Sequence, residues 1–110
     1  MAGDATQVAT QFFAAARTLA IHTGNLQERL ADAYADHLLT VTMSDLPAEL
    51  QPIFRELEER LNRGAESADD DDDEDPFQAA ARDLTDAEAR SLIERILLLY
   101  GRLMESVRAT

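Results

Sequence analysis

The sequence predicts an all-α protein, an up-and-down four-helix bundle with a disordered acidic linker between helices three and four. Apolar residues recur at helical spacing along most of the 110-residue chain, and no stretch alternates as a strand would. Aromatic residues make up only 5% of the chain, so Leu, Ile, Val and Ala must fill the core, which favours helix packing. This length suits a single helical domain spanning 1–110.

The first two helices are expected over residues 6–22 and 25–42. Gly24 has the position of a left-handed residue that ends a helix, and Asn25 with Glu28 has the pattern of a capping box. So short a turn predicts an antiparallel hairpin. The two apolar stripes are Val8, Phe12, Ala15, Ala16 and Leu19, then Leu26, Leu30, Ala33, Tyr34, His37, Leu38 and Val41.

The third helix is expected over residues 46–62, with Ser44 or Asp45 as its cap and Pro47 in its first turn. Pro52 removes a backbone donor inside this pattern, which predicts a kink there or a separate one-turn helix from 46 to 51. The apolar face of this helix contains Leu50, Ile53, Phe54, Leu57 and Leu61.

Residues 64–75 form a low-complexity acidic linker whose like charges predict disorder, and a short helix is expected at 76–82. The fourth helix, expected at 85–108, opens with Thr85 and Glu88 as a capping box. Leu98 falls outside its apolar arc, which suggests surplus apolar surface for a partner or a second copy. That arc contains Leu92, Ile93, Ile96, Leu97, Leu99, Tyr100, Leu103, Met104 and Val107.

The net charge of −12 is concentrated in one uninterrupted acidic run, which leaves about −5 for the rest of the chain. The run consists of Asp69, Asp70, Asp71, Asp72, Asp73, Glu74 and Asp75. All ten basic residues are Arg, scattered from Arg17 to Arg108, so we expect no direct binding to nucleic acid or to a membrane. The first twenty residues lack the pattern of a secretory signal or membrane anchor, which predicts a cytoplasmic location.

The patterns of the common catalytic sites are absent, so we expect neither an enzyme nor a bound cofactor. The chain has no Cys, which excludes disulfides and thiolate sites. The acidic run fails as an EF-hand calcium loop, because the sixth and twelfth positions from Asp69 hold Glu74 and Ala80. Glu56 and Glu59 have the spacing of one half of a bundle metal site, but the fourth helix offers no matching pair.

The two histidines fit structural roles. Neither His22 nor His37 has a Glu three residues earlier, as carboxylate-bridged metal bundles require. His22 is expected to contact the free carbonyls at the end of the first helix. His37 lies on an apolar stripe and is expected to be a core or interface histidine that is hydrogen-bonded to a neighbour.

Three segments, IHTGNLQERLADAYADHL, SDLPAELQPIFRELEERL and LTDAEARSLIERILLLY, resemble a set of small bacterial all-helical proteins with no assigned function. The resemblance covers most of the chain outside the acidic linker. It implies the helical fold and carries over no functional residue.

The leading hypothesis is a small non-enzymatic interaction module, such as an adaptor, an accessory subunit or an antitoxin-like regulator, that binds a protein partner through apolar helix surface. The expected contacts are Tyr34, His37, Leu98, Tyr100 and Met104, and the fourth helix also offers a homodimer surface. One alternative is an acidic inhibitor or nucleic-acid decoy that engages a basic protein through Asp69 to Asp75. A metal-dependent helical-bundle hydrolase is the third hypothesis.

Overall fold

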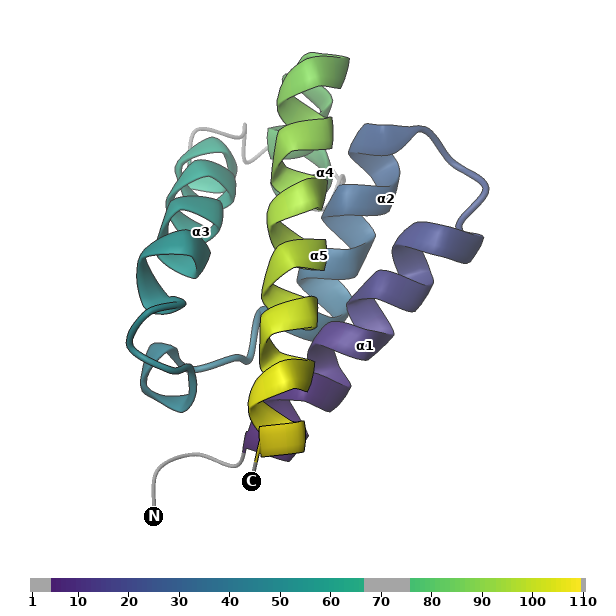
Figure 1. The fold of residues 1–110 in the computed structure, drawn as a ribbon. Helices are drawn as coiled ribbons and strands as arrows, with labels where there is room; N and C mark the ends of the chain where they lie inside the picture. Colours follow the sequence, from purple (N-terminus) through teal and green to yellow (C-terminus); the bar gives the residue numbers. More distant parts are fainter. Residues whose placement is uncertain (1–4, 67–75, 110) are drawn as a thin grey trace.

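Every regular element that the structure describes is helical. The computed structural model describes residues 5–66 and 76–109. Within these residues there is no strand, which confirms the all-α class. α1 (Ala5–Ile21) and α2 (Leu26–Ala33) run in opposite directions as a hairpin, as the short turn between them predicts (Figure 1).

The turn between α1 and α2 needs a glycine for reasons of space. The side chain of Asn25 accepts a hydrogen bond from the Glu28 amide at 2.8 Å, as expected of a cap. The prediction that Gly24 is left-handed is wrong, because no described glycine has a positive φ. A Cβ at this position would lie 2.7 Å from Cε1 of His22 and 3.0 Å from Cβ of Glu28. The close approach of these two side chains therefore excludes any larger residue without rearrangement.

The second helix is shorter than the range 25–42 predicted from the sequence. After α2 the chain continues as a π-helix, η1 (Tyr34–Leu38), in which the Leu39 amide bonds the Tyr34 carbonyl at 2.9 Å. A 3₁₀ turn, η2 (Met43–Asp45), follows. The wider π turn rotates the residues after Tyr34 away from their α-helical positions, which no simple periodicity predicts.

The third helix also differs from its predicted range, 46–62. α3 spans Gln51–Glu66, and the residues expected to cap it, Ser44 and Asp45, lie in η2 instead. Pro52 is the second residue of α3, where the missing amide hydrogen has no intrahelical partner anyway. The helix therefore begins next to the proline, and no kink is needed.

α3 extends further than predicted, into the start of the expected acidic linker. Residues 64–66 belong to α3, so the predicted start of the linker at 64 is wrong. The acidic run from Asp69 to Asp75, and the disorder expected of it, lie outside the described residues.

The chain resumes with two helices close to their predicted ranges. α4 (Pro76–Arg82) is present where a short helix was expected, and α5 (Asp86–Ala109) corresponds to the expected fourth helix. The capping box of α5 is reciprocal. The Glu88 amide donates to the Thr85 hydroxyl at 3.1 Å, and the Thr85 amide donates to the Glu88 carboxylate at 2.9 Å.

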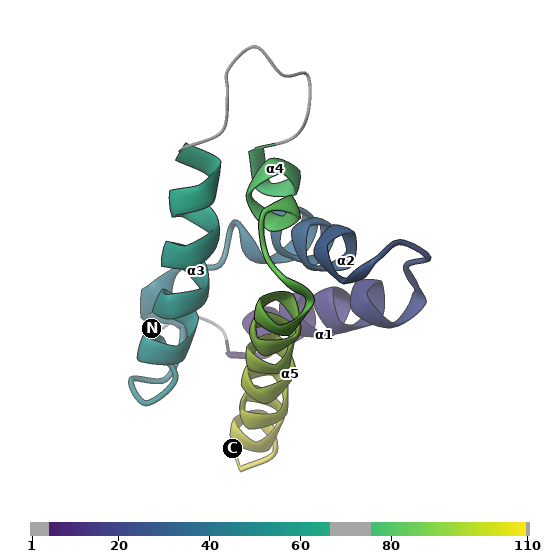
Figure 2. The ribbon, with the colours of Figure 1, turned by 90° about the horizontal axis from the view of Figure 1, so that it is seen from above.

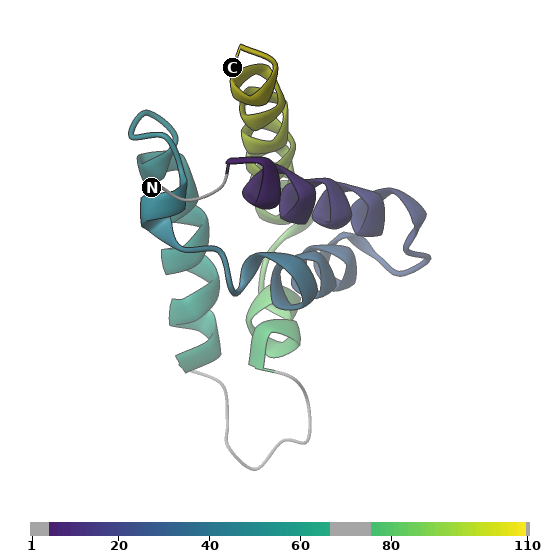
Figure 3. The ribbon, with the colours of Figure 1, turned by 90° about the horizontal axis from the view of Figure 1, so that it is seen from below.

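The four main helices alternate in direction along the chain, as in an up-and-down bundle (Figure 1). Their axes are not all aligned. Figures 2 and 3 show the α1–α2 hairpin crossing α3 and α5 steeply. α5 packs against α1, α2 and α3, while the short α4 packs against α2 and α3. The core therefore includes side chains from a fifth helix, α4, which a four-helix bundle does not have.

The core is mainly aliphatic, with two aromatic pairs that join distant segments. Phe12 of α1 meets Phe54 of α3 edge-on, with ring centroids 5.8 Å apart. Tyr34 of η1 meets Phe77 of α4 in the same way at 5.2 Å. Such pairs add about 0.5–1.5 kcal/mol beyond the area they bury. No helix in the described part of the chain is long and apolar enough to cross a membrane.

Candidate functional site

The most conspicuous exposed apolar surface lies where α1 and α5 meet. Phe13 of α1 is 53% exposed, although its neighbour Phe12 is fully buried. The Phe13 ring lies against Tyr100 of α5, with centroids 6.0 Å apart and planes tilted by 46°. This pair bridges the two helices at the surface.

Tyr100 belongs to an apolar row along one side of α5. At about 100° per residue, the row occupies an arc of about 60° on the helix. Three of its members are partly buried and pack against the core, while Leu97 is 46% exposed. We call this surface the apolar flank: Phe13, Ile93, Leu97, Tyr100 and Met104.

The structure separates the contact residues that the sequence predicts on the fourth helix. Tyr100 and Met104 lie in the apolar flank. Leu98 is 47% exposed but lies about 100° around α5 from Leu97, among charged side chains. Leu97 was expected in the buried arc and is exposed, because the helices packed against α5 leave this side open.

Tyr34 is not a surface residue. It is only 1% exposed and packs against Phe77, so it is unavailable as a contact unless the core opens. Burial, aided by the charge of Glu58, raises the pKa of the Tyr34 hydroxyl to about 12, although a hydrogen bond with the Asn62 side chain acts to lower it. Burial also raises the pKa of Glu58, against the charge of Arg55. Tyr34 therefore belongs to the core.

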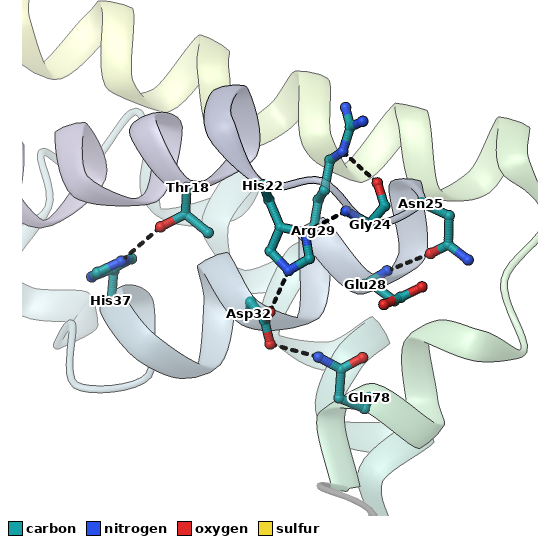
Figure 4. Close-up of polar contacts among 9 residues, drawn as sticks. All are labelled: Thr18, His22, Gly24, Asn25, Glu28, Arg29, Asp32, His37 and Gln78. Carbon is teal, nitrogen blue, oxygen red and sulfur yellow. Dashed lines mark hydrogen bonds and ion pairs between the residues drawn. The ribbon is translucent and has the colours of Figure 1, made fainter.

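His37 is a hydrogen-bonded histidine between two helices, as expected. Its Nε2 lies 2.9 Å from the Thr18 hydroxyl of α1 (Figure 4). The backbone carbonyl of His37 also accepts a bond from the Gln11 side chain at 3.4 Å. The π turn places His37 toward α1, away from the apolar flank, so the two sets of predicted contacts do not form one surface.

A second polar cluster holds the end of α1 against α2 and α4 (Figure 4). Nε2 of His22 lies 2.6 Å from the Asp32 carboxylate, and Nδ1 accepts a bond from the Gly24 amide at 2.8 Å. The Gln78 side chain of α4 donates to the other oxygen of Asp32 at 2.6 Å. The prediction that His22 contacts helix carbonyls is therefore wrong, because its ring turns toward Asp32. Both ring nitrogens of His22 are hydrogen-bonded, so this histidine stabilises the turn between α1 and α2.

The groove between α3 and α5 is charged but internally neutralised. Arg95 pairs with Glu56 at 2.7 Å, and Arg60 pairs with Glu88. The backbone and side chain of Thr85 hold the pKa of Glu88 below its usual value, and Arg60 lowers it further. These cross-helix pairs leave no unopposed charge to hold a charged ligand.

The carboxylates in the described part of the chain do not gather into a metal centre. No group of three or more His, Asp or Glu within 5–66 and 76–109 is placed to hold a metal ion. Glu56, half of the expected Glu56–Glu59 pair, is bound to Arg95. The described residues therefore give the third hypothesis, a metal-dependent hydrolase, no ligand set.

Sequence reasoning missed three members of the apolar flank as contacts: Phe13, Ile93 and Leu97. The sequence does contain a signal that Phe13 is exposed. Two consecutive phenylalanines in a helix point about 100° apart, so a narrow stripe that buries Phe12 leaves Phe13 at its edge. The exposure of Leu97 depends on which helices flank α5, which periodicity does not specify.

Comparison with known proteins finds no relative: no family model, no curated protein and no solved structure matches this chain. The resemblance to small bacterial helical proteins stays a prediction.

Proposed function

We propose that this protein is a non-enzymatic helical interaction module that binds a protein partner through the apolar flank. One observation carries the proposal: Phe13, about half exposed, packs against Tyr100 and extends the apolar surface of α5 onto α1. A contiguous exposed apolar surface of this kind is characteristic of interaction sites on soluble proteins. The cytoplasmic location expected from the sequence is part of this proposal.

The composition of the apolar flank supports a protein partner. Aromatic residues and Met are enriched where proteins meet, since they bury a large apolar area. The flank offers Phe13, Tyr100 and Met104 together with two aliphatic residues. A partner of matching chemistry presents an apolar helix face or an apolar loop, without a requirement for clustered charge.

The experiment compares affinity capture by the wild type with capture by Phe13→Ser and Met104→Ser. Any captured protein is then purified and titrated against each variant. The substitution at Phe13 should weaken binding by at least about tenfold, because hot-spot aromatics contribute about 2 kcal/mol or more. The control is Leu39→Ser, which removes a comparably exposed apolar residue from another part of the surface.

The proposal requires that the Leu39→Ser control binds as the wild type does while the flank variants do not. Circular dichroism must show that all variants keep their helix content. A partner that binds Phe13→Ser and Met104→Ser with unchanged affinity would place the binding surface elsewhere.

A second candidate function rests on the seven consecutive acids, Asp69 to Asp75. Such a run gives a basic protein a concentrated negative charge, as in an inhibitor or a nucleic-acid decoy. Neutralising the run, with each Asp replaced by Asn and Glu74→Gln, should then abolish binding, and binding to the wild type should weaken steeply with salt. Binding through the apolar flank predicts the opposite: weak salt dependence and no effect of neutralisation.

A further inference from the structure

The side of α5 that faces solvent carries a pattern that the apolar flank does not explain. Figure 1 shows α5 in the foreground, with no other described helix in front of it. Two adjacent leucines are about half exposed there, between charged residues toward both ends of the helix. We call this surface the outer face of α5: Arg90, Glu94, Leu97, Leu98, Gly101 and Glu105.

Gly101 has no role within the described chain. It lies in the interior of a 24-residue helix, where glycine costs about 1 kcal/mol relative to alanine. A Cβ at this position would meet nothing within 4 Å, so no neighbouring helix requires its absence. Because glycine has no side chain, it leaves a shallow depression on the outer face, and another backbone or side chain can approach α5 closely there.

The residues of the outer face occupy positions that are symmetric about its two leucines. Steps of three and four residues lead from Leu97 to Glu94 and Arg90. The same steps in the other direction lead from Leu98 to Gly101 and Glu105. A two-fold axis between Leu97 and Leu98 therefore brings Arg90 of each copy to Glu105 of the other.

The same two-fold axis also pairs the other residues of the outer face with compatible partners. About this axis, Leu97 of each copy would lie on Leu98 of the other, and Glu94 would lie over Gly101, beside Arg102 of the other copy. Arg90 and Glu94 form no ion pair with any described residue, and Glu105 has only a 3.8 Å contact with Arg102. These charges are therefore available. A parallel pairing would instead oppose Arg90 to Arg90 and Glu94 to Glu94, which is unfavourable.

We propose that two copies of this chain associate through the outer face of α5 as an antiparallel pair, with Leu97 on Leu98 and Arg90 on Glu105. The pairing is isologous, so each contact occurs twice. The contact takes Leu97 from the edge of each apolar flank but leaves Phe13, Tyr100 and Met104 outside, so a dimer would still present the rest of both flanks. One helix face is a small interface, so we expect a weak dimer.

The first experiment measures the monomer–dimer equilibrium by sedimentation equilibrium. Arg90→Glu and Glu105→Arg each place like charges together twice and should weaken the dimer by about tenfold or more. The double variant exchanges the two charges and should restore association to within about threefold of the wild type. Arg55→Glu, an exposed residue on α3, is the control for net charge and should leave the dimer unchanged.

The second experiment tests the direction of the helices by cross-linking. The natural chain has no Cys, so introduced thiols are the only ones present. When Glu94→Cys and Gly101→Cys proteins are mixed under mild oxidation, the antiparallel pairing predicts mixed disulfides between the two variants. Each variant alone should cross-link poorly, because its two thiols lie roughly 10 Å apart along the helices.

Either experiment can overturn the proposal. A wild type that stays monomeric at millimolar concentration, or a charge exchange that fails to restore the dimer, excludes this interface. Efficient cross-linking of each variant with itself, and not of the mixture, would show a parallel arrangement. Tests of the apolar flank stay distinguishable, because Phe13→Ser alters partner binding without touching the outer face of α5.

Discussion

Nε2 of His22 and the Asp32 carboxylate lie 2.6 Å apart and fasten the turn after α1 to the last turn of α2. Because the Gly24 amide donates to Nδ1 of the ring, Nε2 must carry the proton that is shared with the carboxylate. Asp32 also accepts from Gln78 of α4. One carboxylate thus joins three helices at the edge of the core.

Removing this carboxylate should loosen all three helices together. Asp32→Ala leaves His22 and Gln78 without their acceptor, and we expect it to lower the free energy of unfolding by about 1–3 kcal/mol. Urea titration followed by circular dichroism measures this change. Asp36→Ala is the matched control: it makes the same substitution at an exposed acid that has no hydrogen bond to a described residue. Equal losses in both variants would show that Asp32 has no special role.

Gly24 and Gly101 should respond in opposite ways to substitution by alanine. Gly24→Ala forces a Cβ to within 2.7 Å of His22 and should lower the free energy of unfolding by about 1–2 kcal/mol. Gly101→Ala meets only open space and should raise it by about 0.5–1 kcal/mol, through helix propensity. Thermal unfolding at low protein concentration measures both. A stabilising Gly24→Ala would contradict the close packing of this turn.

The capping box of α5 should make stability depend on acid pH. The pKa of Glu88 is lowered from 4.5 in the folded protein. The contribution of this carboxylate to the stability of the fold is therefore fully present above pH 4.5, and it is lost as the pH falls through the lowered pKa of the folded state. In urea titrations, Glu88→Gln should therefore be less stable than the wild type at pH 7, and the gap should close below pH 4.5. Glu59→Gln, on the exposed side of α3, is the control.

Tyr34 should be visible as a tyrosine that resists ionisation. The chain has two Tyr and no Lys or Cys, so absorbance at 295 nm in a Tyr100→Phe variant reports Tyr34 alone. Its midpoint should lie near pH 12 if the protein stays folded. Since the folded pKa is raised from 10, stability should fall as the pH rises from about 10 toward 12. Tyr34→Phe should remove that part of the fall, and a midpoint near 10 in the folded protein would contradict the burial of the hydroxyl.

The local chemistry of the fold could be predicted from the sequence because caps and stripes involve residues close along the chain. Asn25 and the Thr85–Glu88 pair act as their patterns predict. Pro52 shows the limit: its effect depends on whether it lies inside a helix or in its first turn, and the 3₁₀ segment before it decides that.

The candidate site was less predictable because it depends on how helices lie against each other. Tyr34 was expected at the surface and lies in the core, since α4 brings Phe77 over it. Phe13 was not singled out and lies on the surface beside Tyr100. Both outcomes follow from contacts between segments that are far apart in the sequence. Helical periodicity does not predict such contacts.

The packing of α4 on α3 and α2 has a consequence for how this chain can change over evolution. Those contacts, and not the length of chain between Glu66 and Pro76, hold the two helix ends in place. Doubling the number of residues between two such fixed ends costs only about 0.6 kcal/mol in closure entropy. Insertions and deletions are therefore cheapest in the segment where the acidic charge is densest, so that charge can be lengthened, trimmed or recoded while the helices stay as they are.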